Sequence, residues 1–143
     1  LIRRQRQMCI RDSQNIAMVL ETIPEIRKIT TDCDFKALII SQEEEYQNLS
    51  DSVKDTITSN GDSTEELNDL LKTYSEWMTK LKAMSDKNVS HLSEMCIQGY
   101  TMGMIKAIQK NHLYCDASKE AKHFGDKLIS LHEKSIQDLK KYL

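Results

Sequence analysis

The sequence predicts an all-α protein that folds as one bundle of long helices. Only one proline and four glycines occur in 143 residues, which is too little turn punctuation for a series of short strands. Apolar residues instead recur every three or four positions over long stretches, the spacing of one face of a helix. The length is that of one typical domain with one core.

The first helix is predicted to end near residue 30. Its apolar face is made of Ile16, Val19, Leu20, Ile23, Ile26 and Ile29. Pro24 is expected to kink this helix, because proline lacks an N–H and its ring crowds the preceding turn. The segment 30–34 follows, and its threonines and aspartates are residues that cap helices.

A second helix is predicted from there to about residue 58. Its apolar face is made of Phe35, Leu38, Ile39, Tyr46, Leu49, Val53 and Ile57. Gln42 is the one polar residue in the core register of this face. The acidic run 43–45 lies off the face and is expected to be solvated.

A third helix is predicted over about 64–84. The segment 59–62 separates it from the second helix, and Ser63 with Glu66 has the S-x-x-E pattern of a capping box. Its apolar stripe is made of Leu67, Leu70, Leu71, Tyr74, Trp77, Met78, Leu81 and Met84.

The fourth helix is predicted over about 90–111. An uninterrupted helix from 64 to 110 would be about 70 Å long at ~1.5 Å per residue, so we expect a break between Ser85 and Ser90. Both sides of the fourth helix are apolar, which predicts that it is buried. One side holds Leu92, Met95, Cys96 and Met102, and the other holds Ile97, Met104, Ile105 and Ile108.

The last helix is predicted over about 117–142. Its apolar face is made of Ala121, Phe124, Leu128, Ile129, Ile136, Leu139 and Leu143. His132 falls near the centre of this face. We expect it to be a core histidine hydrogen-bonded to a partner such as Gln42, and a metal ligand or a proton carrier is the alternative.

This order of elements favours a ferritin-like four-helix bundle with an additional crossover helix, at about 64–84, between the second and third bundle helices. Residues 77–110, WMTKLKAMSDKNVSHLSEMCIQGYTMGMIKAIQK, and the tail KLISLHEKSIQDLKKYL resemble an uncharacterised family of ferritin-like four-helix-bundle proteins of anaerobic Firmicutes. The sharpest piece is HLSEMCIQG followed by MGM, and the resemblance covers essentially all of 14–143. It implies a ferritin-like fold and a cytoplasmic bacterial protein, and it carries no assigned activity onto any residue.

Residues 3–13 resemble a translated transposase sequencing adapter. The codons CGT CGG CAG CGT CAG ATG TGT ATA AGA GAC, followed by AG, reproduce Arg3 to Asp12 and permit Ser13. A native basic leader is the alternative. We therefore expect 1–13 to be a non-native segment, and 14–143 to be a single helical-bundle domain that is truncated at its N-terminus.

Charge and cysteine content narrow the classes of function. Without the four arginines and one aspartate of 1–13, the formal charge falls from -2 to -5, which disfavours nucleic acid because phosphate binding needs clustered positive charge. No apolar run is long enough to span a membrane, so no membrane partner is expected. Setting Cys9 aside leaves Cys33, Cys96 and Cys115 without a metal-binding or redox spacing, which favours a soluble protein of a reducing cytoplasm.

A di-iron or di-manganese site in such a bundle needs about four inward carboxylates and two histidines, with Glu-x-x-His on two helices. The sequence contains no Glu-x-x-His, and its nearest pair, His91 and Glu94, runs in the reverse order. We therefore expect no cofactor. The alternative is a degenerate ferritin-like site, metal-binding or oxidoreductase, that holds iron or manganese through His91, Glu94 and His132.

Two further patterns are expected to serve packing. Gly99 and Gly103 form a GxxxG pair, which predicts close helix packing inside the bundle because Gln98 and Lys106 interrupt the apolar run that a membrane dimer needs. Five methionines are expected to fill the core, with an adaptable binding groove as the alternative. They are Met78, Met84, Met95, Met102 and Met104.

No Gly-rich phosphate loop, GxSxG elbow or catalytic Ser/His/Asp order occurs, so no catalytic residue can be assigned. The leading hypothesis is a non-enzymatic helical scaffold or protein-interaction module that self-associates through exposed apolar surface. A third class, thiol-based redox sensing by Cys33 and Cys115, requires that their two loops share one end of the bundle.

Overall fold

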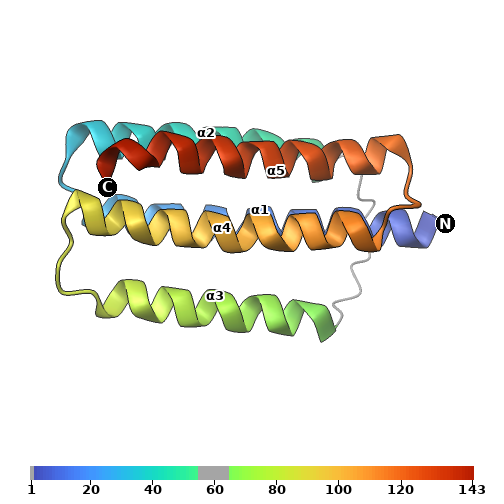
Figure 1. Cartoon of the computed structure of the whole chain (residues 1–143), viewed down its shortest axis with the longest axis horizontal. Coiled ribbons are helices and arrows are strands. Elements are labelled where there is room, and N and C mark those ends of the chain that lie inside the picture. The colour runs from blue at the N-terminus through green and yellow to red at the C-terminus, as the bar shows by residue number, and fades with distance from the viewer. Residues whose placement is uncertain (1, 55–64) are drawn as a thin grey trace.

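The computed structural model describes residues 2–54 and 65–143, with side chains over 3–54 and 71–143, and these ranges contain helices and no strand (Figure 1). The helices are α1 (Ile2–Ile29), α2 (Cys33–Lys54), α3 (Glu65–Ala83), α4 (Val89–Leu113) and α5 (Lys119–Leu139), and a short 3-10 turn, η1 (Lys140–Tyr142), follows α5. The predicted all-α class is therefore confirmed. The predicted breaks near 30–34 and 85–90 separate α1 from α2 and α3 from α4.

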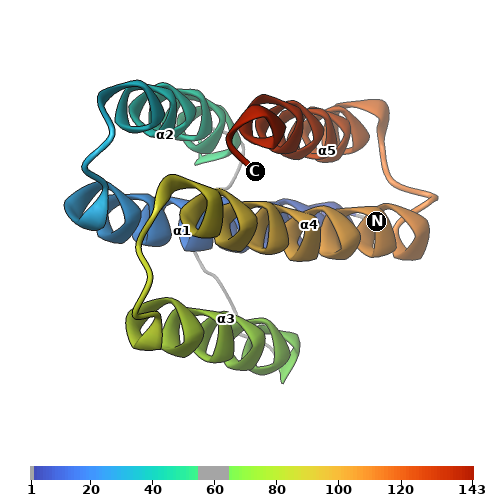
Figure 2. The same cartoon turned by 60° about the vertical axis from the view of Figure 1, so that its left-hand side comes forward.

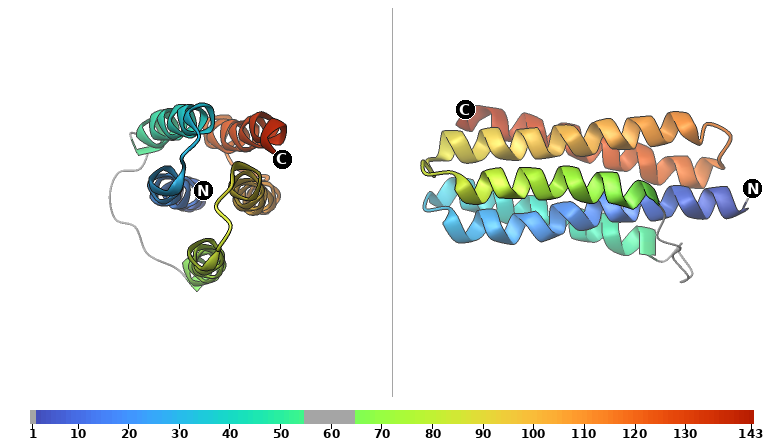
Figure 3. Two further views of the ribbon diagram at one scale, coloured as in Figure 1. Left: turned by 90° about the vertical axis from the view of Figure 1, so that its left-hand side faces the viewer. Right: turned by 90° about the horizontal axis from the view of Figure 1, so that it is seen from below.

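Helices α1, α2, α4 and α5 form the body of the molecule. Seen end-on, they lie at the corners of a square, with α1 opposite α5 and α2 opposite α4 (Figure 3). Helices at neighbouring corners run antiparallel (Figures 1 and 3). Helix α3 lies outside this square, on the side of α1 and α4, as the turned view also shows (Figure 2). Helix α4 is consequently flanked by α5 on one side and by α3 on another.

Short polar side chains start three of the helices. The carboxylate of Asp32 accepts a hydrogen bond from the backbone N–H of Phe35 at 2.8 Å, and the amide oxygen of Asn88 accepts one from the N–H of His91 at 2.8 Å. The hydroxyl of Ser118 accepts one from the N–H that lies three residues further along the chain, at 3.3 Å. Each of these bonds satisfies a backbone donor that the first turn of a helix leaves without an intrahelical partner.

The ends of two helices differ from the prediction. Helix α1 begins at Ile2 and not within 14–143, the range in which the first helix was expected, because the arginines, glutamines and methionine of 3–8 are good helix formers and continue the helix toward the N-terminus. Helix α1 also continues through Pro24 without ending there. The kink expected at this proline stays a prediction. Helix α5 ends at Leu139 in a tighter turn. The predicted end of the second helix, Ile57 and the capping box of the third helix lie outside the described side chains.

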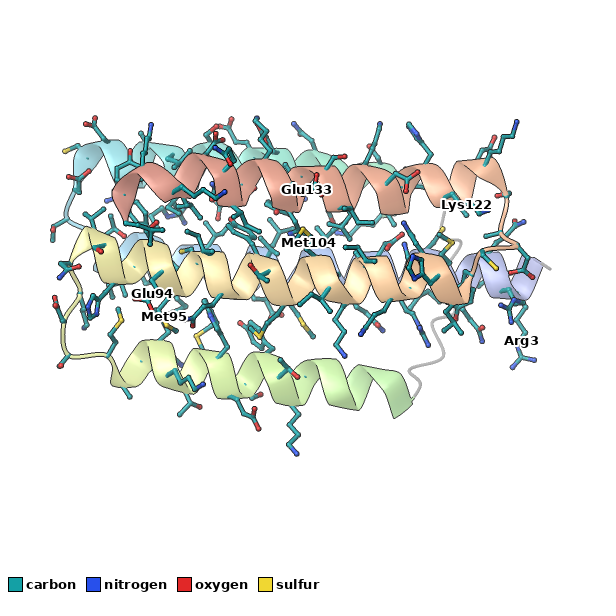
Figure 4. All side chains as sticks on the ribbon, viewed as in Figure 1. Arg3, Glu94, Met95, Met104, Lys122 and Glu133 are labelled. Carbon is teal, nitrogen blue, oxygen red and sulfur yellow. The ribbon has the colours of Figure 1, made fainter. Side chains whose placement is uncertain are left out.

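The predicted apolar faces supply most of the core. Buried positions from these faces include Ile16, Ile23, Ile26, Phe35, Ile39, Tyr46, Leu49, Val53, Trp77, Leu81, Leu92, Cys96, Ala121, Leu128 and Leu139. Met95 points from α4 toward α3, and Met104 lies on the side of α5, so both sides of α4 face other helices (Figure 4).

Among the described side chains, three residues of the predicted apolar faces are exposed instead. The exposed fractions are 44% for Leu71, 47% for Ile105 and 62% for Leu143. The buried side chains among those described in α3 are Trp77 and Leu81.

Within the described ranges, no helix combines the length and the apolarity that crossing a bilayer requires.

Candidate functional site

A cluster of polar side chains lies at the centre of the four-helix body. Every corner helix contributes to it, and each member is at most 6% exposed. We name it the central polar cluster, and it consists of Asn15 of α1, Gln42 and Tyr46 of α2, Tyr100 of α4, and His132 and Ser135 of α5.

Both ring nitrogens of His132 are engaged. Its Nε2 lies 3.0 Å from the amide oxygen of Asn15, and its Nδ1 lies 2.8 Å from the hydroxyl of Tyr46. The amide nitrogen of Asn15 donates to the carbonyl oxygen of Gly103 at 2.9 Å, so the amide oxygen is the atom that faces His132 and can only accept. Nε2 therefore carries the ring hydrogen, and Nδ1 accepts from Tyr46. The Tyr46 hydroxyl in turn accepts a hydrogen bond from the hydroxyl of Ser135, at 3.3 Å.

Gln42 joins the remaining members of the cluster. Its side-chain oxygen accepts a hydrogen bond from the hydroxyl of Tyr100 at 2.8 Å, and its nitrogen donates to the backbone carbonyl of Ser135 at 3.3 Å. The rings of Tyr46 and Tyr100 stack beside these bonds, with centroids 5.5 Å apart and planes 6° from parallel. The cluster is thus bonded through its own side chains and two backbone carbonyls.

His132 is a buried, hydrogen-bonded core residue as expected, but the predicted partner was wrong by one helical turn. Helices α2 and α5 run antiparallel, and Tyr46 lies level with His132 while Gln42 lies level with Ser135. Periodicity places Gln42 and His132 on the core faces of their helices, but it does not fix how far one helix slides along the other. The packing of side chains sets that register.

Burial keeps the cluster uncharged near neutral pH. Loss of solvation lowers the pKa of His132 to about 3, because the imidazolium form would have no water around it. The same loss raises the pKa of the hydroxyls of Tyr46 and Tyr100 above the usual range for tyrosine. A general base needs a pKa near the working pH and a free nitrogen within reach of a substrate. His132 offers neither in this arrangement, and its hydrogen bonds join α5 to α1 and α2.

Sequence reasoning missed Asn15, Tyr100 and Ser135. A signal existed for all three, because each lies four residues from a residue of a predicted apolar face: Asn15 from Val19, Tyr100 from Cys96, and Ser135 from Leu139. Polar residues in a core register indicate buried hydrogen bonds. The partners of these bonds depend on interhelical register and could not be predicted.

The candidate metal ligands are not brought together. His91 and Glu94 are exposed in the first turns of α4, and the His91 ring lies 3.9 Å from a carboxylate oxygen of Asp86. His132 lies level with Gly103, which follows His91 by twelve residues on the same helix, about 18 Å at ~1.5 Å per residue. Within the described residues, no group of three or more His, Cys, Asp or Glu side chains has the placement of a metal site.

A second buried polar contact lies between α1 and α4, outside the central polar cluster. The ammonium of Lys110 donates to a carboxylate oxygen of Asp12 at 2.5 Å, and the side chains of both are at most 3% exposed. The other carboxylate oxygen of Asp12 has no hydrogen-bond partner among the described residues. Burial therefore raises the pKa of the Asp12 carboxyl, although the charge of Lys110 opposes this. Asp12 belongs to the segment that resembles a translated adapter.

The thiols fall into two groups. Cys9 and Cys96 are buried, and burial raises the pKa of the Cys96 thiol to about 12. Cys33 and Cys115 are exposed. Cys33 begins α2, whereas Cys115 lies in the α4–α5 connection, and these two places are at opposite ends of the molecule (Figure 1). The requirement that both loops share one end is not met, so these two thiols cannot pair within one chain.

The acidic run 43–45 is at the surface, as expected, but it is partly paired. The carboxylate of Glu43 accepts a hydrogen bond from Arg27 at 2.6 Å, and that of Glu45 accepts one from Lys134 at 2.5 Å. Glu44 is exposed.

Comparison of the chain with protein-family models, with curated proteins and with solved structures finds no match.

Proposed function

We propose that this chain is a non-enzymatic helical scaffold or protein-interaction module. The closed hydrogen bonding of the central polar cluster is the observation that carries the proposal. His132 is fully buried, its two nitrogens are bonded to Asn15 and Tyr46, and burial holds it neutral. A buried network that is fully bonded fixes one relative register of its helices, because any slip leaves polar groups without partners.

We also propose a ferritin-like topology in which α3 is the crossover helix. Helix α3 returns the chain to the end at which α2 begins, so α2 and α4, at opposite corners, run in the same direction (Figures 1 and 3). Ferritin-like bundles have one such long connection between their second and third helices. The family resemblance of 77–110 supports the same topology. The resemblance also supports a bacterial cytoplasmic location. No residue of the central polar cluster lies in the adapter-like segment 3–13.

Self-association is the form of interaction that the exposed apolar side chains support. Leu71, Ile105 and Leu113 are 44%, 47% and 52% exposed. We expect light scattering to give a mass above 16.6 kDa that rises with protein concentration, and the double variant Leu71→Lys, Ile105→Lys to shift this rise to higher concentration. A mass that stays at the monomer value up to high concentration would remove self-association from the proposal.

A metal-binding experiment decides between the scaffold and the degenerate ferritin-like alternative. The full chain, purified without chelator, is dialysed against Fe²⁺ under anaerobic conditions or against Mn²⁺, and bound metal is measured per chain. The scaffold proposal predicts less than one equivalent, with no difference between the wild type and the variants His132→Gln and His91→Gln. Stoichiometric metal that is lost in either variant would overturn the proposal and favour an iron or manganese site.

A further inference from the structure

We propose that a cleft between α1, α3 and α4 is a binding site for a small aliphatic carboxylate. The cleft has a volume of about 90 Å³. Its lining residues come mainly from α1, α3 and α4. Helix α3 lies outside the four-helix body, on the side of α1 and α4 (Figures 2 and 3). The cleft contains no residue of the adapter-like segment, and the inference is independent of the proposed scaffold function.

Two glycines of α4 allow close packing beside the cleft. Gly99 and Gly103 lie one turn apart on α4, and both line the cleft. A Cβ atom on Gly99 would lie 3.3 Å from the ring of Trp77, and one on Gly103 would lie 3.0 Å from the polar atoms of both Asn15 and His132. The missing side chains thus make room for the Trp77 ring and for the contact between Asn15 and His132, which confirms the predicted close packing at the GxxxG pair.

The walls of the cleft are suited to an apolar ligand. They are formed largely by aliphatic, methionine and aromatic side chains, among them Met18, Val19, Ile23 and Met102. Polar atoms of two lining residues are directed to protein partners: the indole N–H of Trp77 donates to the carbonyl of Met95 at 2.9 Å, and the amide of Asn15 is used as described above. Apolar cavities hold water poorly and take up apolar molecules.

The volume of the cleft and the charged residues near it narrow the class of ligand further. The cleft is smaller than an apolar cavity of ~150 Å³ that accepts benzene, so it suits a short alkyl chain better than a ring system. Lys106 lines the cleft and is exposed, so its ammonium can meet an anionic end group at the mouth while the chain lies inside. Glu21 and Glu25 lie near Tyr74, another lining residue, so an amine is the competing class that the experiment must exclude.

The single tryptophan of the chain provides the readout, because the Trp77 ring lines the cleft. The full chain is titrated with hexanoate, hexanol and hexylamine, with free N-acetyltryptophanamide as the blank for solvent effects. We expect a saturable change in Trp77 emission with hexanoate, weaker binding of hexanol, and the weakest binding of hexylamine. From butanoate to hexanoate, affinity should rise roughly fourfold per methylene, the effect of burying one more CH₂ group.

Two variants test separately what the charge of Lys106 and the cavity contribute to binding. Lys106→Met should weaken hexanoate binding by about two- to fivefold, the range for an exposed ion pair, and should leave hexanol binding unchanged. Lys127→Met, which removes an exposed lysine that does not line the cleft, is the matched control and should change neither. Val19→Phe, which adds a ring to the wall, should abolish binding of both ligands, with folding checked by circular dichroism.

Three outcomes would overturn the proposal. The first is an absence of saturable binding by hexanoate and hexanol in the wild type. The second is hexanoate affinity that Val19→Phe leaves unchanged while this variant is folded. The third is hexylamine binding more tightly than hexanoate, which would reject the carboxylate class. If Val19→Phe does not fold, Lys106→Met and Lys127→Met still test the carboxylate, because both substitutions are on the surface.

Discussion

Asn15 and His132 face each other across the centre of the molecule, with the imidazole Nε2 3.0 Å from the amide oxygen. Their helices, α1 and α5, occupy opposite corners of the four-helix square (Figure 3). A bond across the diagonal is possible because Gly103 of the neighbouring α4 has no side chain there. One direct hydrogen bond therefore ties two helices that would otherwise be separated by the core.

Replacing His132 by leucine should lower the free energy of unfolding by about 2–5 kcal/mol, since the amide oxygen of Asn15 and the hydroxyl of Tyr46 would each lose a buried partner. Urea denaturation followed by circular dichroism measures the loss. The matched control is His123→Leu, an exposed position on the same helix, which should change stability by less than about 0.5 kcal/mol. Equal stability of the two variants would mean that the bonds of His132 contribute nothing.

The buried imidazole should also make stability depend on pH. The pKa of His132 is about 3 in the folded chain, against 6.5 for an unperturbed histidine. Above pH 6.5 neither state protonates the ring, and below it the unfolded chain binds a proton that the folded chain excludes. Stability should therefore fall with decreasing pH, by up to roughly 1.4 kcal/mol per unit between about pH 6 and pH 4.5.

Urea midpoints measured across this window for the wild type and for His132→Gln test the assignment. The variant should have the shallower slope, because the other three histidines, at 91, 112 and 123, are exposed and remain in both proteins. Parallel slopes would assign the pH dependence to groups other than His132.

The helical faces were predictable from the sequence because a buried face repeats every three to four residues wherever a helix packs on a core. That rule placed Gln42, Tyr46 and His132 inward correctly. It could not pair them, since the register between antiparallel helices depends on side chains from both, and the actual pairing of His132 with Tyr46 is one turn away from the expected one.

The order of the elements predicted a crossover helix at about 64–84, but its apolar stripe could not tell how much of this helix is buried. Leu71 is 44% exposed, whereas Trp77 and Leu81 are buried. An apolar stripe shows that a helix has a face suited to burial, but it does not show how much of that face a neighbouring helix covers. The cleft beside α3 could not be predicted, because the sequence showed Gly99 and Gly103, two of its lining residues, only as a packing motif.

Breaking the buried pair of Lys110 and Asp12 should be costly. Asp12→Ala should lower the free energy of unfolding by about 3–5 kcal/mol, because it leaves the ammonium of Lys110 buried without its carboxylate. The double variant Asp12→Ala, Lys110→Met should recover most of this loss, since it removes the uncompensated charge as well. Denaturation of both variants completes the test, and an additive double variant would contradict coupling between the two groups.

The four thiols should react in two groups. Cys33 and Cys115 are exposed and should be labelled by iodoacetamide in the folded chain, whereas Cys9 and Cys96 should react only as the chain unfolds, since burial raises the pKa of both. Mass spectrometry of peptides from native and urea-treated samples distinguishes the groups. After mild oxidation, a disulfide between Cys33 and Cys115 of the same chain should be absent, and detecting one in the monomer would contradict their placement at opposite ends.

The two glycines of α4 should respond differently to alanine. Alanine is favoured over glycine inside a helix by about 1 kcal/mol, so each substitution carries the same local gain. At Gly99 the new Cβ meets the edge of the Trp77 ring at 3.3 Å, and a shift of a few tenths of an ångström relieves the contact. At Gly103 the new Cβ lies 3.0 Å from both Asn15 and His132, which are bonded to each other and cannot both move away.

Gly99→Ala should therefore be neutral or slightly stabilising, and Gly103→Ala should destabilise the chain by about 1–3 kcal/mol, the usual cost of overpacking a core. Urea denaturation of the two variants gives the difference directly, with each variant serving as the other's control for helix propensity. Equal effects of the two substitutions on stability would mean that the contact between His132 and Asn15 does not depend on the missing side chain of Gly103.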